Sequence, residues 1–137
     1  MTTATLLLTD RDRHQLQRLI DVSRPYAYGN LSDIEALQQE LRQAEIVANG
    51  TLPEDVVAMN SEVRLHDLES GDEETVQLVF PALADAGHGR LSVLTAAGAA
   101  VLGGRVGDVV TWPDASGIRR LRIEEVLSPA ARRLHTV

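Results

Sequence analysis

Apolar residues in the first part of the chain recur at intervals of three and four, which is the period of an α-helix. A first helix is predicted from a Thr9 cap to about Ser23. Its apolar stripe consists of Leu16, Leu19 and Ile20. Asp12 stands where the acid of a capping box is found. Pro25 ends the helix, because the residue before a proline is pushed out of helical geometry.

A second helix is predicted from the capping box Ser32–Glu35 to about Ala48, with Asn49–Gly50 as its stop. Its apolar seam has coiled-coil spacing and consists of Ile34, Leu37, Leu41, Ala44 and Ala48. Neither helix would be stable alone, so the two are expected to pair as an antiparallel helical hairpin, a short coiled coil. The turn between them places Pro25, Tyr26 and Tyr28 at the tip, where the tyrosines pack over the helix ends or contact a partner.

From Met59 onward the pattern changes to the alternation of a β-strand. The predicted strands contain Val63–Leu65, Val76–Phe80, Leu91–Leu94, Val109–Trp112 and Leu121–Val126, with Pro81 and Pro113 ending the second and fourth. The fold class is therefore α+β, an antiparallel sheet with one short helix after the helical hairpin. The expected organisation is a hairpin over residues 1–50, a linker over 51–58 and a second domain over 59–137.

The stretch Gly89–Asp108 organises this second half. Thr95 can cap a short helix over Ala96–Leu102, which Gly103–Gly104 then stops. This helix is made of small residues, so it can lie close against a sheet. On spacing alone, a buried structural element and a functional corner are about equally favoured.

Composition excludes several classes of function. The net charge of −7 and the pI near 5.0 argue against direct DNA binding. There is no cysteine for a thiol or zinc–thiolate site, and all 13 basic residues are arginine. The four histidines are too scattered for a local metal motif, and no catalytic or phosphate-loop motif is present. We therefore expect no catalytic residues, metal or cofactor. Neither a signal peptide nor a membrane span is visible, so a cytoplasmic protein is expected.

Two charged clusters have ordinary explanations. The acidic run Asp72–Glu74 is typical of a solvated turn, although it could bind a cation. Arg119, Arg120 and Arg122 form a small basic patch, which is either a solvated sheet face or a contact for an acidic partner.

The order of several motifs resembles one family. These are P-Y-A-Y-G at Pro25–Gly29, M-N-S-x-V-x-x-x-D-L at Met59–Leu68, L-V-x-P at Leu78–Pro81, L-S-V at Leu91–Val93 and G-A-A-V-L-G-x-R-V-G-D at Gly98–Asp108. Together they are similar to the regulators of nucleoside diphosphate kinase (Rnk), relatives of the transcript-cleavage factors GreA and GreB. The resemblance implies a coiled coil followed by an FKBP-like domain, and binding near the secondary channel of bacterial RNA polymerase.

The resemblance also implies a partner-binding corner, formed in this chain by Thr95, Ala96, Ala97, Gly98 and Leu102. The family commonly has proline where this chain has Ala96. The cleavage factors carry acidic residues at the tip of a longer coiled coil, whereas residues 22–32 contain no acid. The leading hypothesis is a monomeric, non-catalytic regulator that binds RNA polymerase and competes with Gre-type factors. The alternatives are an active cleavage factor, an FKBP-type prolyl isomerase and a general protein-interaction module.

Overall fold

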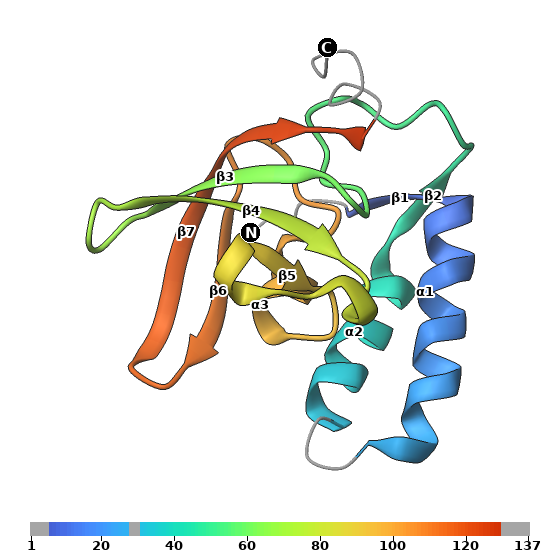
Figure 1. The fold of residues 1–137 in the computed structure, drawn as a ribbon. Helices are drawn as coiled ribbons and strands as arrows, with labels where there is room; N and C mark the ends of the chain where they lie inside the picture. The colour runs from blue at the N-terminus through green and yellow to red at the C-terminus, as the bar shows by residue number, and fades with distance from the viewer. Residues whose placement is uncertain (1–5, 28–30, 130–137) are drawn as a thin grey trace.

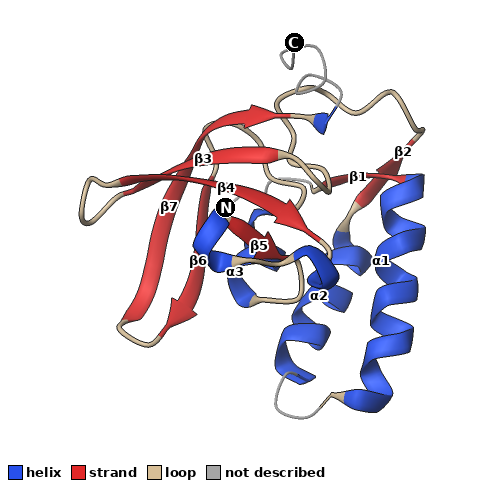
Figure 2. Cartoon of the chain, in the orientation of Figure 1, coloured by secondary structure: helices blue, strands red, loops and turns tan. Residues whose placement is uncertain are grey.

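The computed structural model describes residues 6–27 and 31–129, which form a mixed α+β fold around a curled sheet (Figures 1 and 2). The sheet has the strand order β5-β4-β3-β7-β6. Its strands are β3 (Glu62–Asp67), β4 (Glu73–Val79), β5 (Arg90–Ser92), β6 (Val109–Asp114) and β7 (Gly117–Leu127). The helices are α1 (Asp10–Ser23), α2 (Leu31–Gln43) and α3 (Ala96–Val101), with short 3₁₀ turns at Arg24–Tyr26, Pro81–Leu83 and Ala86–His88. A separate pair of strands is formed by β1 (Leu7–Thr9) and β2 (Glu45–Val47).

The first helix has the predicted ends. The Thr9 hydroxyl oxygen accepts a hydrogen bond from the Asp12 backbone N–H at 3.1 Å, and α1 ends at Ser23 before Pro25. The carboxylate of Asp12 does not close a capping box. Its Oδ2 instead accepts the backbone N–H of Met59 at 3.0 Å, a residue 47 positions later in the chain. This hydrogen bond ties the first turn of α1 to the segment that leads into the sheet.

The second helix is shorter than predicted. It begins at Leu31, so Ser32 lies inside it rather than at its cap, and it ends at Gln43 instead of Ala48. Residues Glu45–Val47 form β2, which runs parallel to β1 with Ile46 opposite Leu8. The helix ends at Gln43 because the backbone groups of the next residues form hydrogen bonds with the β1 segment instead. The Glu45 N–H, for example, donates to the Leu6 carbonyl at 2.7 Å. Such a pairing depends on a strand far away in sequence.

The sheet is mixed rather than antiparallel throughout. β3 pairs antiparallel with β4 and β7, and β6 with β7, as predicted, but β4 and β5 are parallel. The two 3₁₀ turns between residues 81 and 88 carry the chain back, so β5 runs in the direction of β4. β6 also continues through Pro113, predicted as its end. Proline is tolerated there because β6 is the edge strand, where its missing N–H faces no partner strand.

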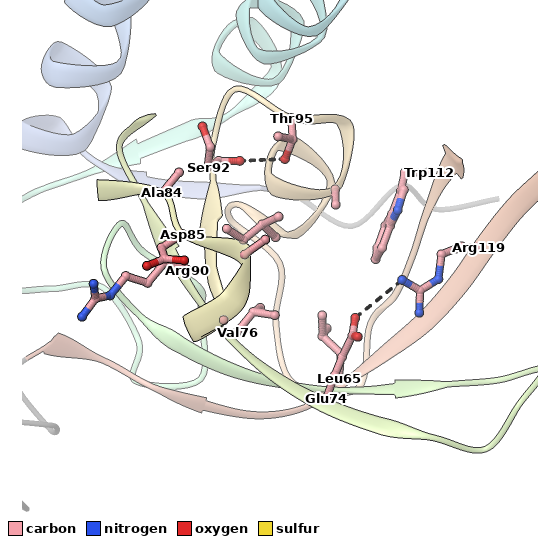
Figure 3. Close-up of a pocket in the computed structure, with 14 residues that line it drawn as sticks. Leu65, Glu74, Val76, Ala84, Asp85, Arg90, Ser92, Thr95, Trp112 and Arg119 are labelled. Carbon is pink, nitrogen blue, oxygen red and sulfur yellow. Dashed lines mark hydrogen bonds and ion pairs between the residues drawn. The ribbon is translucent and has the colours of Figure 1, made fainter. Parts of the chain in front are cut away.

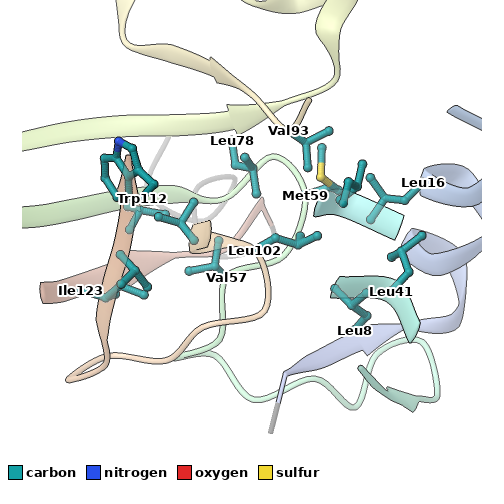
Figure 4. Close-up of a cluster of buried hydrophobic side chains, with 14 of the residues drawn as sticks. Leu8, Leu16, Leu41, Val57, Met59, Leu78, Val93, Leu102, Trp112 and Ile123 are labelled. Atoms are coloured by element: carbon teal, nitrogen blue, oxygen red, sulfur yellow. The ribbon is translucent and has the colours of Figure 1, made fainter. Parts of the chain in front are cut away.

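One hydrophobic core joins the helices to the sheet (Figure 4). Leu16 from α1 and Leu37 from α2 belong to the same buried cluster as Leu65 and Ile123 from the sheet. Residues 51–58, predicted as a linker, contribute Val56 and Val57, which are 1% and 0% exposed. The Val57 N–H donates to the Gly104 carbonyl at 2.8 Å, and the Gly103 N–H donates to the Val57 carbonyl at 2.9 Å. The division of the chain into two domains stays a prediction.

The short helix α3 has the predicted cap and lies very close to β5. The Thr95 hydroxyl accepts the Gly98 N–H at 3.0 Å and donates to the Ser92 carbonyl at 2.7 Å. A Cβ atom on Gly98 would lie 2.1 Å from that same Ser92 oxygen. The prediction that small residues let this helix approach the sheet is therefore confirmed, and Gly98 is the position that requires it.

Replacing Gly98 by alanine should destabilise the fold by about 2–3 kcal/mol, because backbone atoms of β5 or α3 must move apart. Urea unfolding measures the change. The matched control is Gly87→Ala, where the new Cβ would have its nearest contact at 3.5 Å. Equal stability of the two variants would contradict the close-contact assignment.

Asp12 should make stability fall as pH rises. Burial raises the pKa of Asp12 above its ordinary value of 3.8, outweighing the hydrogen bond from Met59. The folded state then binds more protons than the unfolded state, so the contribution of this group declines as pH rises from about 3.8 through the raised value.

The measurement is urea unfolding between pH 4 and pH 7 of the natural protein and of Asp12→Asn. The asparagine variant keeps an acceptor for the Met59 N–H, so its stability relative to the natural protein should improve as pH rises. Asp12→Ala, which removes the acceptor, should lose about 1–2 kcal/mol. A stability difference between the natural and asparagine proteins that does not change with pH would refute this assignment.

Candidate partner-binding pocket

A pocket of about 420 Å³ opens where the five strands of the sheet, β3 to β7, meet the start of α3 (Figure 3). Its apolar lining comes from the inward positions of three strands together with the edge of β5: Leu65, Val76, Leu91 and Trp112. Strand alternation explains this arrangement, because every second side chain of β3 and β4 points to the same side of the sheet. Charged residues lie at the margin, and they include Glu74 and Arg119 on one side and Asp85 and Arg90 on the other.

Arg119 is held in place from several directions. Its guanidinium contacts Asp67 at 3.1 Å, Glu74 at 3.7 Å and Asp114 at 3.8 Å. Its Cζ atom also lies 5.5 Å from the centre of the Trp112 ring, within the range of a cation–π contact. An arginine fixed by three carboxylates and an indole ring keeps one orientation, so it forms a rigid margin of the pocket.

Two of the carboxylates around Arg119, Asp67 and Asp114, have pKa values lowered mainly by local hydrogen bonds. Backbone N–H groups of Ser70 and Glu69, followed by the Arg119 side chain, lower the pKa of Asp67. The hydroxyl and N–H of Ser116 do the same for the pKa of Asp114, with a smaller contribution from Arg119. The charges on this side of the pocket therefore persist at neutral pH.

The opposite margin is built around Asp85. Its Oδ1 accepts the Gly87 N–H at 3.1 Å, and its Oδ2 lies 2.6 Å from Nδ1 of His88. Backbone bonds between Asp85 and Arg90 close this loop against β5, with N–O distances of 2.9 and 3.0 Å. Both margins are thus fixed, and the mouth presents alternating positive and negative groups.

The predicted corner borders this pocket but only part of it is accessible. Thr95 and Ala97 line the pocket, and half-buried Ala96 packs partly against the core at the first position of α3. Gly98 and Leu102 are buried, Leu102 at 1% exposure. These two residues support the corner from beneath rather than forming its surface.

The predicted tip lies at the far end of α1 and is not part of the pocket (Figure 1). Pro25 and Tyr26 are exposed, Tyr26 at 75%, and Val22 and Leu31 beside them are exposed as well. Tyr28 lies outside the described residues. Arg24 at this end forms an ion pair with Glu35 of α2. The corner and the tip are therefore separate surfaces.

The hydroxyl groups that line the pocket are engaged in hydrogen bonds within the protein. The Thr95 hydroxyl is occupied by the Ser92 carbonyl and the Gly98 N–H, and Ser92 Oγ accepts the Leu94 N–H at 3.1 Å. No histidine or cysteine is among the described residues that line it. Elsewhere, on the outer face of the sheet, ligand atoms of His66, Glu73 and Glu124 lie within 4.8 Å of one another. No helix in the described ranges has the length and apolar character needed to cross a membrane.

Two residues of the predicted corner, Thr95 and Ala97, line the pocket, and the sequence did not assign the other lining residues to a site. Arg119 was grouped with Arg120 and Arg122 as a basic patch, yet it occupies the same strand phase as buried Leu121 and Ile123 and turns toward the pocket. The alternation of Arg119, Leu121 and Ile123 along the strand is the sequence signal that places Arg119 on the inner face of the sheet. The contribution of Trp112, Asp85 and Arg90 depends on strand register and could not be read locally.

Comparison with known proteins agrees with this fold. The family described as transcription elongation factor, GreA/GreB, C-term, matches residues 52–128. The regulator of nucleoside diphosphate kinase of Escherichia coli K12 is 36% identical over 118 residues, which cover 86% of this chain and 85% of that protein. The transcription elongation factor GreA of Thermodesulfovibrio yellowstonii is 28% identical over an alignment that covers 72% of this chain and 79% of the GreA chain.

Solved structures give the same result. A GreA/GreB elongation factor from Nitrosomonas europaea superposes with a TM-score of 0.73 and 32% identity, covering 89% of this chain and 98% of that one. Three findings confirm the resemblance indicated by the motifs: the family match, the alignment with the Escherichia coli protein over most of both chains, and this superposition. The chain belongs to the GreA/GreB family of transcription elongation factors, together with the regulators of nucleoside diphosphate kinase.

Proposed function

We propose that the protein is a non-catalytic transcription regulator that binds bacterial RNA polymerase near its secondary channel through the pocket beside Thr95–Ala97. The observation that carries this proposal is the pocket itself, with an apolar floor and a rigid charged margin. Such a site suits a protein segment that inserts an apolar side chain and pairs its flanking charges. Membership of an elongation-factor family supports polymerase as the partner. The proposed setting is the bacterial cytoplasm, with the protein acting as a monomer.

The proposal includes competition with Gre-type factors without stimulation of RNA cleavage. A carboxylate must reach within about 2.0–2.1 Å of a magnesium ion to hold it. Helix α1 has 14 residues, a length of about 21 Å at the α-helical rise. The tip between residues 22 and 32 carries no acid in the sequence, and its described side chains are partly apolar and exposed. A tip without acids offers no carboxylate for such an ion, so the proposed function does not include RNA cleavage.

The alternative of prolyl isomerase activity has less support. A proline-binding pocket needs several convergent aromatic side chains. Among the described lining residues, Trp112 is the one aromatic group. As a finer description of the fold, we propose that α1 and α2 act as a short helical hairpin on an FKBP-like domain. The support is the pairing of the Gln17 and Gln38 amides between the two helices at 3.0 and 3.1 Å.

Ala97→Glu should weaken binding to core RNA polymerase at least tenfold, or about 1.4 kcal/mol. The new carboxylate would stand in the pocket lining, close to the apolar floor. Ala48→Glu makes the same charge change at an exposed position outside the pocket lining and should bind normally. Ala96→Pro should bind equally or more tightly, because proline suits the first helical position and Thr95, the residue before it, is already extended with ψ at 161°.

Fluorescence anisotropy of the labelled protein gives these affinities, and circular dichroism verifies that each variant is folded. Unchanged affinity of folded Ala97→Glu would show that a different surface contacts the polymerase.

Stalled elongation complexes with a labelled transcript test the absence of cleavage. The protein alone should give no shortening at the RNA 3′ end, because no tip carboxylate is available. Added before GreA, it should reduce GreA-dependent cleavage in proportion to its occupancy. Shortening by the protein alone would refute the claim about the tip, and failure to compete at saturation would refute the shared site.

A further inference from the structure

Three strands bring possible metal ligands together on the outer face of the sheet. His66 of β3 lies directly opposite Glu73 of β4 and opposite Arg122 of β7, and Glu124 follows two residues further along β7. One ligand atom from each of His66, Glu73 and Glu124 lies within 4.8 Å of the others. Because side chains alternate along a strand, this face is opposite to the one that Leu65 and Glu74 present to the pocket.

His66 has an unusual local environment for a histidine. Its Nδ1 atom is buried and has no hydrogen-bond partner among the described residues. The nearest carboxylate oxygen, on Glu73, is 3.7 Å away, which is too far for a hydrogen bond. Buried polar atoms are normally satisfied, so an unsatisfied imidazole nitrogen next to two carboxylates indicates a place for a further group. A cation that accepts the nitrogen lone pair would satisfy all three side chains.

Arg122 is the competitor for this position. Its guanidinium donates to Glu124 Oε1 from Nη2 at 2.9 Å and from Nε at 3.2 Å. The same carboxylate oxygen becomes available to a cation if the arginine side chain turns away. Arg122 is 43% exposed, which leaves it room to do so.

We propose that His66, Glu73 and Glu124 form a binding site for a divalent transition-metal ion of the zinc class, controlled by Arg122. Imidazole nitrogen with two carboxylates is a ligand set for zinc, cobalt or nickel rather than for magnesium or calcium, which take oxygen ligands. Zinc holds such atoms at about 2.0–2.2 Å, so the side chains rotate inward while the strands keep their register. Water completes the coordination. The site is separate from the polymerase-binding proposal and does not depend on it.

Isothermal titration of the untagged, chelator-stripped full chain with Zn²⁺ tests the site. The natural protein should bind one ion saturably. His66→Ala and Glu124→Gln should each weaken binding at least tenfold, because each removes one of three ligands. Arg122→Gln should tighten binding about threefold or more, because it frees the Glu124 carboxylate. Ordinary metal contamination or a purely structural role for His66 does not predict this last increase.

Matched controls come from the other histidines. His88 and His14 each lie beside a single aspartate, at 2.6 Å from Asp85 and 3.3 Å from Asp10, and His88→Ala and His14→Ala should bind zinc normally. His135→Ala tests the remaining histidine. Addition of Co²⁺ to ¹⁵N-labelled protein should shift amide signals of residues 64–67, 72–75 and 122–125 first.

Absence of saturable binding to the natural protein would overturn the proposal. So would full affinity of His66→Ala, or a loss of binding in any of the three control variants. His66→Gln, a milder change, replaces His66→Ala in the titration if the alanine protein is not folded by circular dichroism.

Discussion

The arrangement of this protein depends on the close contact between Gly98 and the carbonyl of Ser92. The contact leaves no room for a side chain, and it allows Thr95 to bond simultaneously to the strand before it and the helix after it. Helix α3 is thereby fixed on β5 and packs against β6 and α2. That position puts Ala97 at the pocket and buries Val101 and Leu102 in the core. One glycine thus connects the geometry of the site with the stability of the fold.

The sequence predicted those parts of the fold that are determined locally. Caps at Thr9 and Thr95, the end of α1 at Ser23 and the alternation in β3, β4 and β7 all arise from residues close together in the chain, and each is found. The departures come from distant partners. Residues 45–47 carry a helical pattern but pair with β1, and β5 runs parallel to β4 because of the turns before it. Asp12 has the spacing of a capping box and binds Met59 instead.

The candidate site shows the same division. The corner Thr95–Ala97 was recognisable because its cap, small residues and glycine stop are contiguous. The rest of the pocket comes from Leu65, Glu74, Trp112 and Arg119, which strand register alone brings together. The group of His66, Glu73 and Glu124 is spread over 59 positions and has no motif spacing, so it could be found only once β3, β4 and β7 were aligned.

The bonds that join the N-terminal helices to later segments also bear on how the chain is made. During synthesis α1 and α2 leave the ribosome before the sheet does. Asp12 cannot form its hydrogen bond until Met59 has been made. The contact of Leu7 with Gly103, whose N–H donates to the Val57 carbonyl, forms later still. Helices of 14 and 13 residues are marginal on their own in water. The parts of their apolar stripes that pack on the sheet therefore stay uncovered until those sheet segments have been translated. Closing these long loops slows folding, and the uncovered apolar surface exposes the nascent chain to aggregation in the meantime.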